Sequence, residues 1–141
     1  MNKKFILGIA AAAALAVGSL SVSAEGFAKT NTYTPGMFND VPASEWYASS
    51  VSSSYELGFM KGTADGVFSP EGNMTVAEAI TIAARVHDAY NAKGTTFSQN
   101  GTNWYDEYVK YAIDNGIIKA DAFDDYDRPV KRYEMAVIFS K

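Results

Sequence analysis

Residues 46–61 read WYASSVSSSYELGFMK, and residues 104–119 read WYDEYVKYAIDNGIIK. The two stretches lie 58 residues apart and agree at five of sixteen positions, against roughly one match expected by chance. The matched pairs are Trp46/Trp104, Tyr47/Tyr105, Val51/Val109, Gly58/Gly116 and Lys61/Lys119. After a two-residue deletion the agreement continues, with Glu78 aligned on Glu134. This pattern indicates two copies of one repeat.

Each copy predicts a helix, a loop and a second helix. In the first copy, Ser44 is expected to cap a helix over residues 45–57, and Gly58 to end it in a left-handed turn. Residues 61–73 are punctuated by glycine and predict a loop with one short extended piece at most. Thr75 and Glu78 form a capping-box pattern that opens the second helix, which continues to about residue 91.

These elements predict an all-α fold of tandem helix–loop–helix repeats. Neither helix pair can bury both of its apolar faces alone, so the copies are expected to stack and to form the core between them. The expected division of the chain is a signal peptide (1–24), an N-terminal linker (25–37), repeat 1 (38–91), a linker (92–103) and an incomplete repeat 2 (104–141).

The first 24 residues have the pattern of a secretory signal peptide. Lys3 and Lys4 precede an apolar run over residues 5–17, and small residues at −3 and −1 predict cleavage after Ala24. A membrane anchor is the less favoured alternative, because the run is shorter than the ~20 residues that a stable span prefers. Cleavage would change the formal charge from −4 to −6, and the protein is expected to be exported.

Composition excludes several classes of function. The 141 residues contain no cysteine and one histidine, which excludes disulfides, thiolate zinc sites and a cysteine nucleophile. The net negative charge argues against nucleic acid as a partner, because phosphate recognition needs a clustered basic surface. An acidic cluster is formed by Asp121, Asp124, Asp125 and Asp127, but its spacing fails the EF-hand pattern, so we expect a solvated loop and no metal site.

Several motifs together resemble the S-layer homology (SLH) domain family. They are Phe38-Asn39-Asp40-Val41, Trp46-Tyr47, Val51, Gly58, Gly62, the run from Asp65 to Pro70, and Thr75-Val76-Ala77-Glu78. The resemblance covers residues 38–91 well and 97–141 more loosely. It implies a non-catalytic module without cofactors that holds a protein at the cell wall or S-layer by binding secondary cell-wall polysaccharide, often pyruvylated. It also implies three repeats in an SLH-type bundle with ligand grooves between them.

The sequence departs from the family pattern at several positions. Val76 stands where the family has arginine, and Arg132 restores that arginine in the second copy, where Lys131 replaces the capping threonine. Ala120 replaces the glycine equivalent to Gly62. No third repeat follows, which leaves two alternatives: a fragment of a longer protein, or a homo-oligomer in which another chain completes the grooves.

The resemblance and the chemistry of sugar binding predict the ligand-binding residues. A site for an acidic sugar needs an aromatic ring on which the sugar stacks, a cation that can pair with the carboxylate through two donors, and a backbone that the ligand can approach closely. The candidate aromatic rings are Trp46 and Trp104. Arg132 is the candidate cation, and Gly62 is the candidate for close approach of the backbone. Further candidates are Asp40, Thr75, Glu78 and Glu134, for which capping or loop fixing is the alternative role. Core packing is the alternative for both tryptophans.

Two functions remain at this stage. The first is non-catalytic anchoring through an anionic secondary cell-wall polysaccharide. The second is a degenerate SLH pair that acts as a structural or self-assembly element without binding glycan. No pair of carboxylates is placed across one cleft and no nucleophile-elbow pattern occurs, so an enzyme is not expected.

Overall fold

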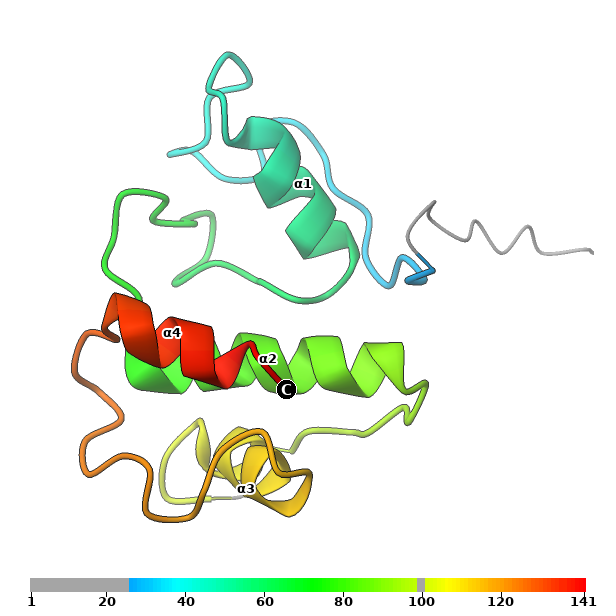
Figure 1. Cartoon of the computed structure of the whole chain (residues 1–141). Coiled ribbons are helices and arrows are strands. Elements are labelled where there is room, and N and C mark those ends of the chain that lie inside the picture. The colour runs from blue at the N-terminus through cyan, green and yellow to red at the C-terminus, as the bar shows by residue number, and fades with distance from the viewer. Residues whose placement is uncertain (1–25, 99–100) are drawn as a thin grey trace, which may run out of the picture.

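The computed structural model describes residues 26–98 and 101–141 (Figure 1). Four helices occur in these ranges: α1 (Ala48–Glu56), α2 (Val76–Tyr90), α3 (Asp106–Asp114) and α4 (Arg132–Ile138). The described residues contain no strand, only isolated bridges such as Ala64 with Val67 and Thr75 with Pro129. The all-α expectation is confirmed. The expected signal peptide lies outside the described residues, and within them no helix is long and apolar enough to cross a membrane.

Helix α1 begins later than expected. Its N-cap is Tyr47, which makes no side-chain capping bond, so the prediction that Ser44 caps this helix was wrong. The preceding residues turn instead, since Glu45 N donates to Pro42 O at 3.1 Å and Ala48 N to Glu45 O at 3.0 Å. The C-terminal end is as expected, because Gly58 adopts φ +74° in the left-handed region.

Helix α2 begins with the expected capping box. Thr75 Oγ1 accepts from Glu78 N at 3.2 Å, and Glu78 Oε2 accepts from Thr75 N at 2.8 Å. The next two amides, which have no acceptor within the helix, bind the segment that precedes α4: Val76 N donates to Arg128 O and Ala77 N to Tyr126 O, at 3.0 and 2.9 Å. The start of α2 is therefore fixed to residues of the second copy.

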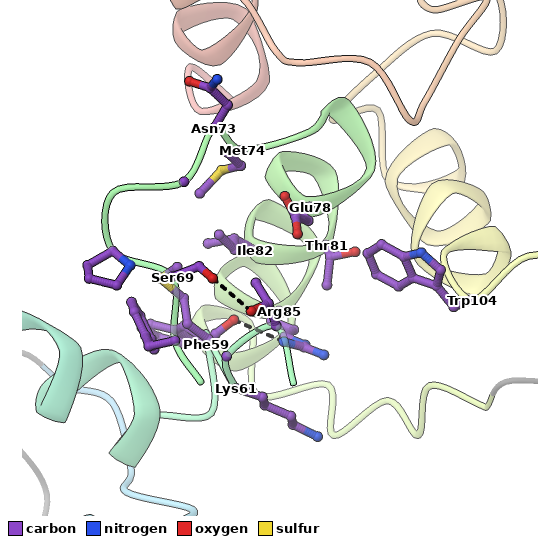
Figure 2. A pocket seen from close by; sticks show the side chains of 16 residues that line it. Phe59, Lys61, Ser69, Asn73, Met74, Glu78, Thr81, Ile82, Arg85 and Trp104 are labelled. Atoms are coloured by element: carbon purple, nitrogen blue, oxygen red, sulfur yellow. Dashed lines mark hydrogen bonds between the residues drawn. The ribbon is translucent and has the colours of Figure 1, made fainter. Parts of the chain in front are cut away.

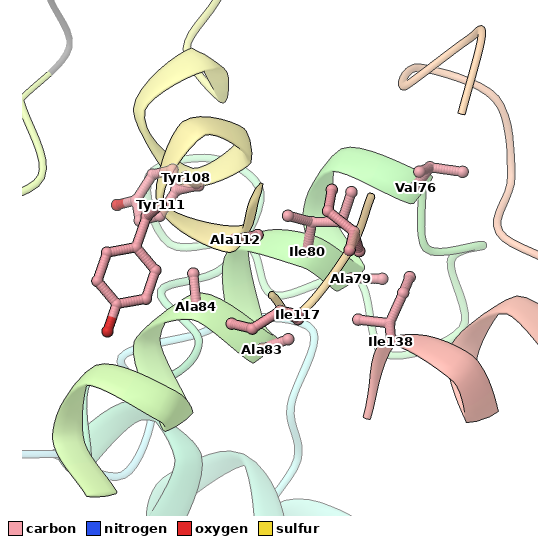
Figure 3. Close-up of a cluster of buried hydrophobic side chains, with 11 residues drawn as sticks. Val76, Ala79, Ile80, Ala83, Ala84, Tyr108, Tyr111, Ala112, Ile117 and Ile138 are labelled. Carbon is pink, nitrogen blue, oxygen red and sulfur yellow. The ribbon is translucent and has the colours of Figure 1, made fainter. Parts of the chain in front are cut away.

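The larger core is built around α2, which packs against both α3 and α4 (Figures 1 and 3). Ile80 and Ile138 are almost completely buried in it. Its other buried members are Val76, Ala79, Ala83, Ala84, Tyr108, Tyr111, Ala112, Ile117 and Ile118. This core joins residues from both copies of the repeat.

Helix α1 belongs to a second, smaller cluster and packs against none of the other three described helices. Its apolar stripe is covered by the segment before it, and the buried members of the cluster are Phe38, Val41, Val51 and Phe68. The same segment closes the end of the helix, because the backbone amides of Thr30 and Asn31 both donate to Glu56 O, at 2.8 and 3.0 Å. The two helices of the first copy are thus held by different neighbours.

Candidate functional site

A groove of about 570 Å³ lies between the first copy's loop, one face of α2, and Trp104 from the second copy (Figure 2). Residues 59–63, 68–70 and 72–74 contribute to its walls, and α2 contributes Glu78, Thr81, Ile82 and Arg85. Three of the ligand-binding residues predicted from sequence line it, namely Gly62, Glu78 and Trp104.

Arg85 is the cation held most firmly in the groove. Its Nη1 donates to Phe59 O at 3.1 Å and its Nη2 to the Tyr108 hydroxyl at 2.8 Å. The guanidinium also lies 5.0 Å from the centre of the Tyr108 ring, a cation–π distance. Arg85 therefore links the first loop to α3 and keeps its positive charge at the groove.

Lys61 supplies a second positive charge from the loop. The side chain is exposed and makes no hydrogen bond or ion pair within residues 26–98 and 101–141. Nearby, the hydroxyls of Thr63 and Ser69 lie 3.0 Å apart. With Glu78 as the one carboxylate among the lining residues, the groove carries two positive groups and one negative group.

Gly62 is required by the loop's own backbone. It adopts φ +86°, and a Cβ there would lie 2.5 Å from Val67 O and 2.9 Å from a ring carbon of Phe38. Any side chain would push these atoms apart or force a strained backbone. Gly62 lines the groove, and its backbone lies closest to Val67 on the opposite side of the same loop.

Asp40 supports the groove wall from behind. Its carboxylate accepts from Phe68 N at 2.9 Å and from Ser69 N at 2.6 Å. The hydrogen bonds from these two backbone amides lower the pKa of Asp40 below its ordinary value, and the bond from Phe68 has the larger effect. Asp40 fixes the position of residues 68 and 69, and Thr75 caps α2; neither side chain lines the groove.

The two tryptophans occupy different settings. Trp104 is 44% exposed and lines the groove, whereas Trp46 is 86% exposed and does not. Each indole meets the ring of the following tyrosine edge-on, with centroids 5.5 Å apart in both copies.

The start of α4 does not line the groove. Arg132 is its first residue, is exposed, and is not among the groove's lining residues. Glu134 is 6% exposed and is held by Arg128, at 2.9 Å from Nη1 and 2.7 Å from Nη2, and by Lys131 N at 2.7 Å. Arg128 is the main reason why the pKa of Glu134 falls from 4.5 to about 2.

The groove residues that the sequence analysis missed include Lys61, Thr81 and Arg85. Lys61 had a usable signal, because it is one of the five identities between the copies. Glu78, Thr81 and Arg85 follow each other at i, i+3 and i+7, which places them on one face of a helix. The sequence alone does not say that this face borders a groove.

No group of three or more histidine, cysteine or acidic side chains that could hold a metal occurs in the part of the chain that the structure describes. Asp125 has a local role in its loop, where its Oδ1 accepts from Asp127 N at 2.9 Å. What the groove offers is a set of charged, hydroxyl and aromatic groups suited to binding a polar ligand.

The fold is helical, its loop depends on a glycine, and its groove is lined by a tryptophan ring. These features are typical of a binding module. The family model for the S-layer homology domain matches residues 38–80. The chain thus carries an S-layer homology domain over these residues.

The similar proteins are surface-layer proteins. The chain is 28% identical over 143 residues to the Surface-layer 125 kDa protein of Lysinibacillus sphaericus, covering 94% of this chain and 11% of that one. It is 33% identical over 119 residues to the S-layer protein sap of Bacillus anthracis and 30% identical over 119 residues to an S-layer protein of Bacillus thuringiensis subsp. finitimus. Each of these two alignments covers 83% of this chain and 14% of the relative. No solved structure matches the chain significantly.

The chain thus spans between 11% and 14% of the length of these relatives. The S-layer homology domain and the surface-layer relatives point to an exported protein that is associated with the cell wall.

Proposed function

We propose that the groove binds an anionic secondary cell-wall polysaccharide and thereby holds the protein on the envelope without catalysis. The observation that carries this proposal is the meeting of Trp104, Lys61 and Arg85 at one groove of an S-layer homology domain. These residues come from the loop of the first copy, from α2 and from the second copy.

Each group has a part in binding an acidic sugar. The exposed face of Trp104 can cover the apolar face of a sugar ring. Arg85 and Lys61 can pair with a carboxylate, such as that of a pyruvylated sugar, and Arg85 is already oriented by Phe59 O and Tyr108. Glu78 and the hydroxyls of Thr63 and Ser69 can bind sugar hydroxyls. The charged ligand would be selected by the two cations.

The direct test is co-sedimentation of the mature chain with purified native sacculi, before and after the secondary polysaccharide is stripped. We expect the chain to pellet with untreated sacculi and to stay in solution with stripped ones. A chain that is folded by circular dichroism and fails to pellet with untreated sacculi contradicts the proposal.

Lys61→Gln sharpens the test. This change removes a positive charge without removing any hydrogen bond or ion pair in the described structure, so the fold should be kept. We expect pelleting to weaken several-fold at low salt and the difference to shrink at high salt. Lys119→Gln is the matched control, because Lys119 is the exposed equivalent in the second copy and does not line the groove; equal losses in the two variants would argue against binding in the groove.

Self-assembly without glycan binding is the second candidate function. It is favoured by the exposed apolar side chains of α4, where Tyr133 and Val137 stand one turn apart and are 64% and 56% exposed. Sedimentation velocity across a wide concentration range tests this function. A folded chain that remains monomeric throughout contradicts it.

A further inference from the structure

The groove contains a buried hydroxyl without a partner. Thr81 is 4% exposed, and its Oγ1 is the one buried side-chain nitrogen or oxygen that lacks a hydrogen bond in the described part of the chain. Buried polar atoms in proteins are nearly always hydrogen-bonded, because an unsatisfied one lowers stability. A threonine within a helix commonly donates to the carbonyl four residues earlier, and Thr81 makes no such bond.

This hydroxyl occupies the middle of the polar face that α2 turns to the groove. Glu78 lies one turn before Thr81 and Arg85 one turn after it, and all three line the groove. The Thr81 oxygen points toward the indole of Trp104 (Figure 2). Along α2 the groove therefore presents a carboxylate, a hydroxyl and a guanidinium in a fixed order.

A packing role does not account for the hydroxyl. Valine has nearly the same shape as threonine and would fill the same space without leaving a polar atom unpaired. The cost of the hydroxyl to the free protein is explained if a bound ligand supplies the missing partner. Trp104, at 44% exposure, is the side chain that would move to open access to the Thr81 oxygen.

We infer that Thr81 contacts the ligand and sets its orientation: its hydroxyl bonds a ring hydroxyl of the sugar that lies on Trp104, while the ligand's carboxylate faces Arg85 and Lys61. This inference rests on the proposed function of the groove. It narrows the ligand class to polymers in which a hydroxyl-bearing ring adjoins the negative charge. A polyanion without sugar rings would lack the partner for Thr81.

The test compares Thr81→Val with Thr81→Ser in a Trp46→Phe background, where Trp104 is the remaining tryptophan. The probe is the polysaccharide released from native sacculi, and the readouts are the Kd from Trp104 fluorescence and the Tm of the free protein. We expect Thr81→Val to weaken binding about five- to tenfold while its Tm stays equal or rises. Thr81→Ser keeps the hydroxyl and should bind within about twofold of the parent.

The outcomes distinguish failure of the inference about Thr81 from failure of the proposed function of the groove. If the parent binds and Thr81→Val binds equally well, the inference about Thr81 is overturned while the proposed function stands. A Tm lowered by Thr81→Val with an unchanged Kd also overturns it, because the hydroxyl would then serve the fold. If the parent itself gives no binding, the proposed function fails and the inference fails with it. Poly-L-glutamate is the charge-only comparison, and binding as tight as that of the polysaccharide overturns the ligand class.

Discussion

The two copies of the repeat carry the same aromatic pair in different surroundings. In both, the tryptophan and tyrosine rings lie 5.5 Å apart and nearly perpendicular, at 80° and 82°. Trp104 nevertheless lies against the face of α2 and lines the groove, whereas Trp46 is 86% exposed and does not line it. The local sequence sets how the two rings meet, and a neighbouring copy is needed to make a groove beside them.

The capping glutamates differ in the same way. Glu78 accepts from Thr75 N and lines the groove. Glu134 also caps its helix, through Lys131 N, but both of its oxygens are held by Arg128. Lys131 cannot return the bond from its side chain, because an ammonium group only donates. One copy thus leaves its carboxylate beside the groove, and the other uses it in an ion pair.

The largest expected effect separates the two apolar clusters. Ile80→Ala, in the core shared by α2, α3 and α4, should lower the free energy of unfolding by about 2–5 kcal/mol. Val51→Ala, in the cluster around α1, should cost about 1.5–3 kcal/mol. Thermal unfolding measures the change in the free energy of unfolding, and hydrogen exchange shows which backbone amides lose protection. Val51→Ala should leave the amides of α2 protected; loss of protection throughout the chain would show that the clusters unfold as one unit.

Replacement of the tryptophans tests whether the groove explains their difference. Trp104→Ala should weaken pelleting with sacculi at least about tenfold, because large aromatic side chains commonly dominate a binding surface. Trp46→Ala should leave pelleting close to that of the wild type. The measurement is the bound fraction against sacculus concentration. A larger loss for Trp46→Ala would move the site away from the groove.

The glycine of the loop offers a third comparison. Gly62→Ala should destabilise the protein by more than about 1 kcal/mol, because the new Cβ meets Val67 O and φ is positive. The equivalent position in the second copy already holds alanine. Ala120→Gly should lower the free energy of unfolding by at most about 1 kcal/mol, because glycine raises the conformational entropy of the unfolded chain. Urea titration measures both changes. A gain in stability from Ala120→Gly would mean that Ala120 shares the left-handed backbone of Gly62, contrary to the structure.

The smallest expected effect is the acid sensitivity that Glu134 gives the fold. The pKa of Glu134 is about 2 in the folded protein and 4.5 ordinarily. The unfolded chain therefore takes up the proton first as the pH falls, so the contribution of Glu134 is complete above pH 4.5 and is lost toward pH 2. The Tm of the wild type should fall more steeply across this window than that of Glu134→Gln. If Glu134→Gln and the wild type lose the same Tm between pH 5 and pH 2, the ion pair with Arg128 does not stabilise the fold.

Much of the local structure was predictable from sequence. The all-α class, the capping box of Thr75 and Glu78 and the left-handed glycine after α1 depend on residues close in the chain. The start of α1 was predicted too early, since the turn over residues 42–48 competes with the cap that Ser44 offers. The role of Arg132 as the cation that pairs with the ligand stays a prediction. The cations that line the groove are Arg85 and Lys61.

Sequence by itself predicted the repeat, its helices, the capping box of Thr75 and Glu78, and the family resemblance, because these follow from residue patterns along the chain. Tertiary structure alone decided which side chains share the groove. Arg85 reaches Phe59 across 26 residues, and Asp40 holds Phe68 across 28. Trp104 comes from the other copy altogether. A groove of this kind depends on how separate segments pack, and sequence periodicity does not specify which face of α2 remains uncovered for a ligand.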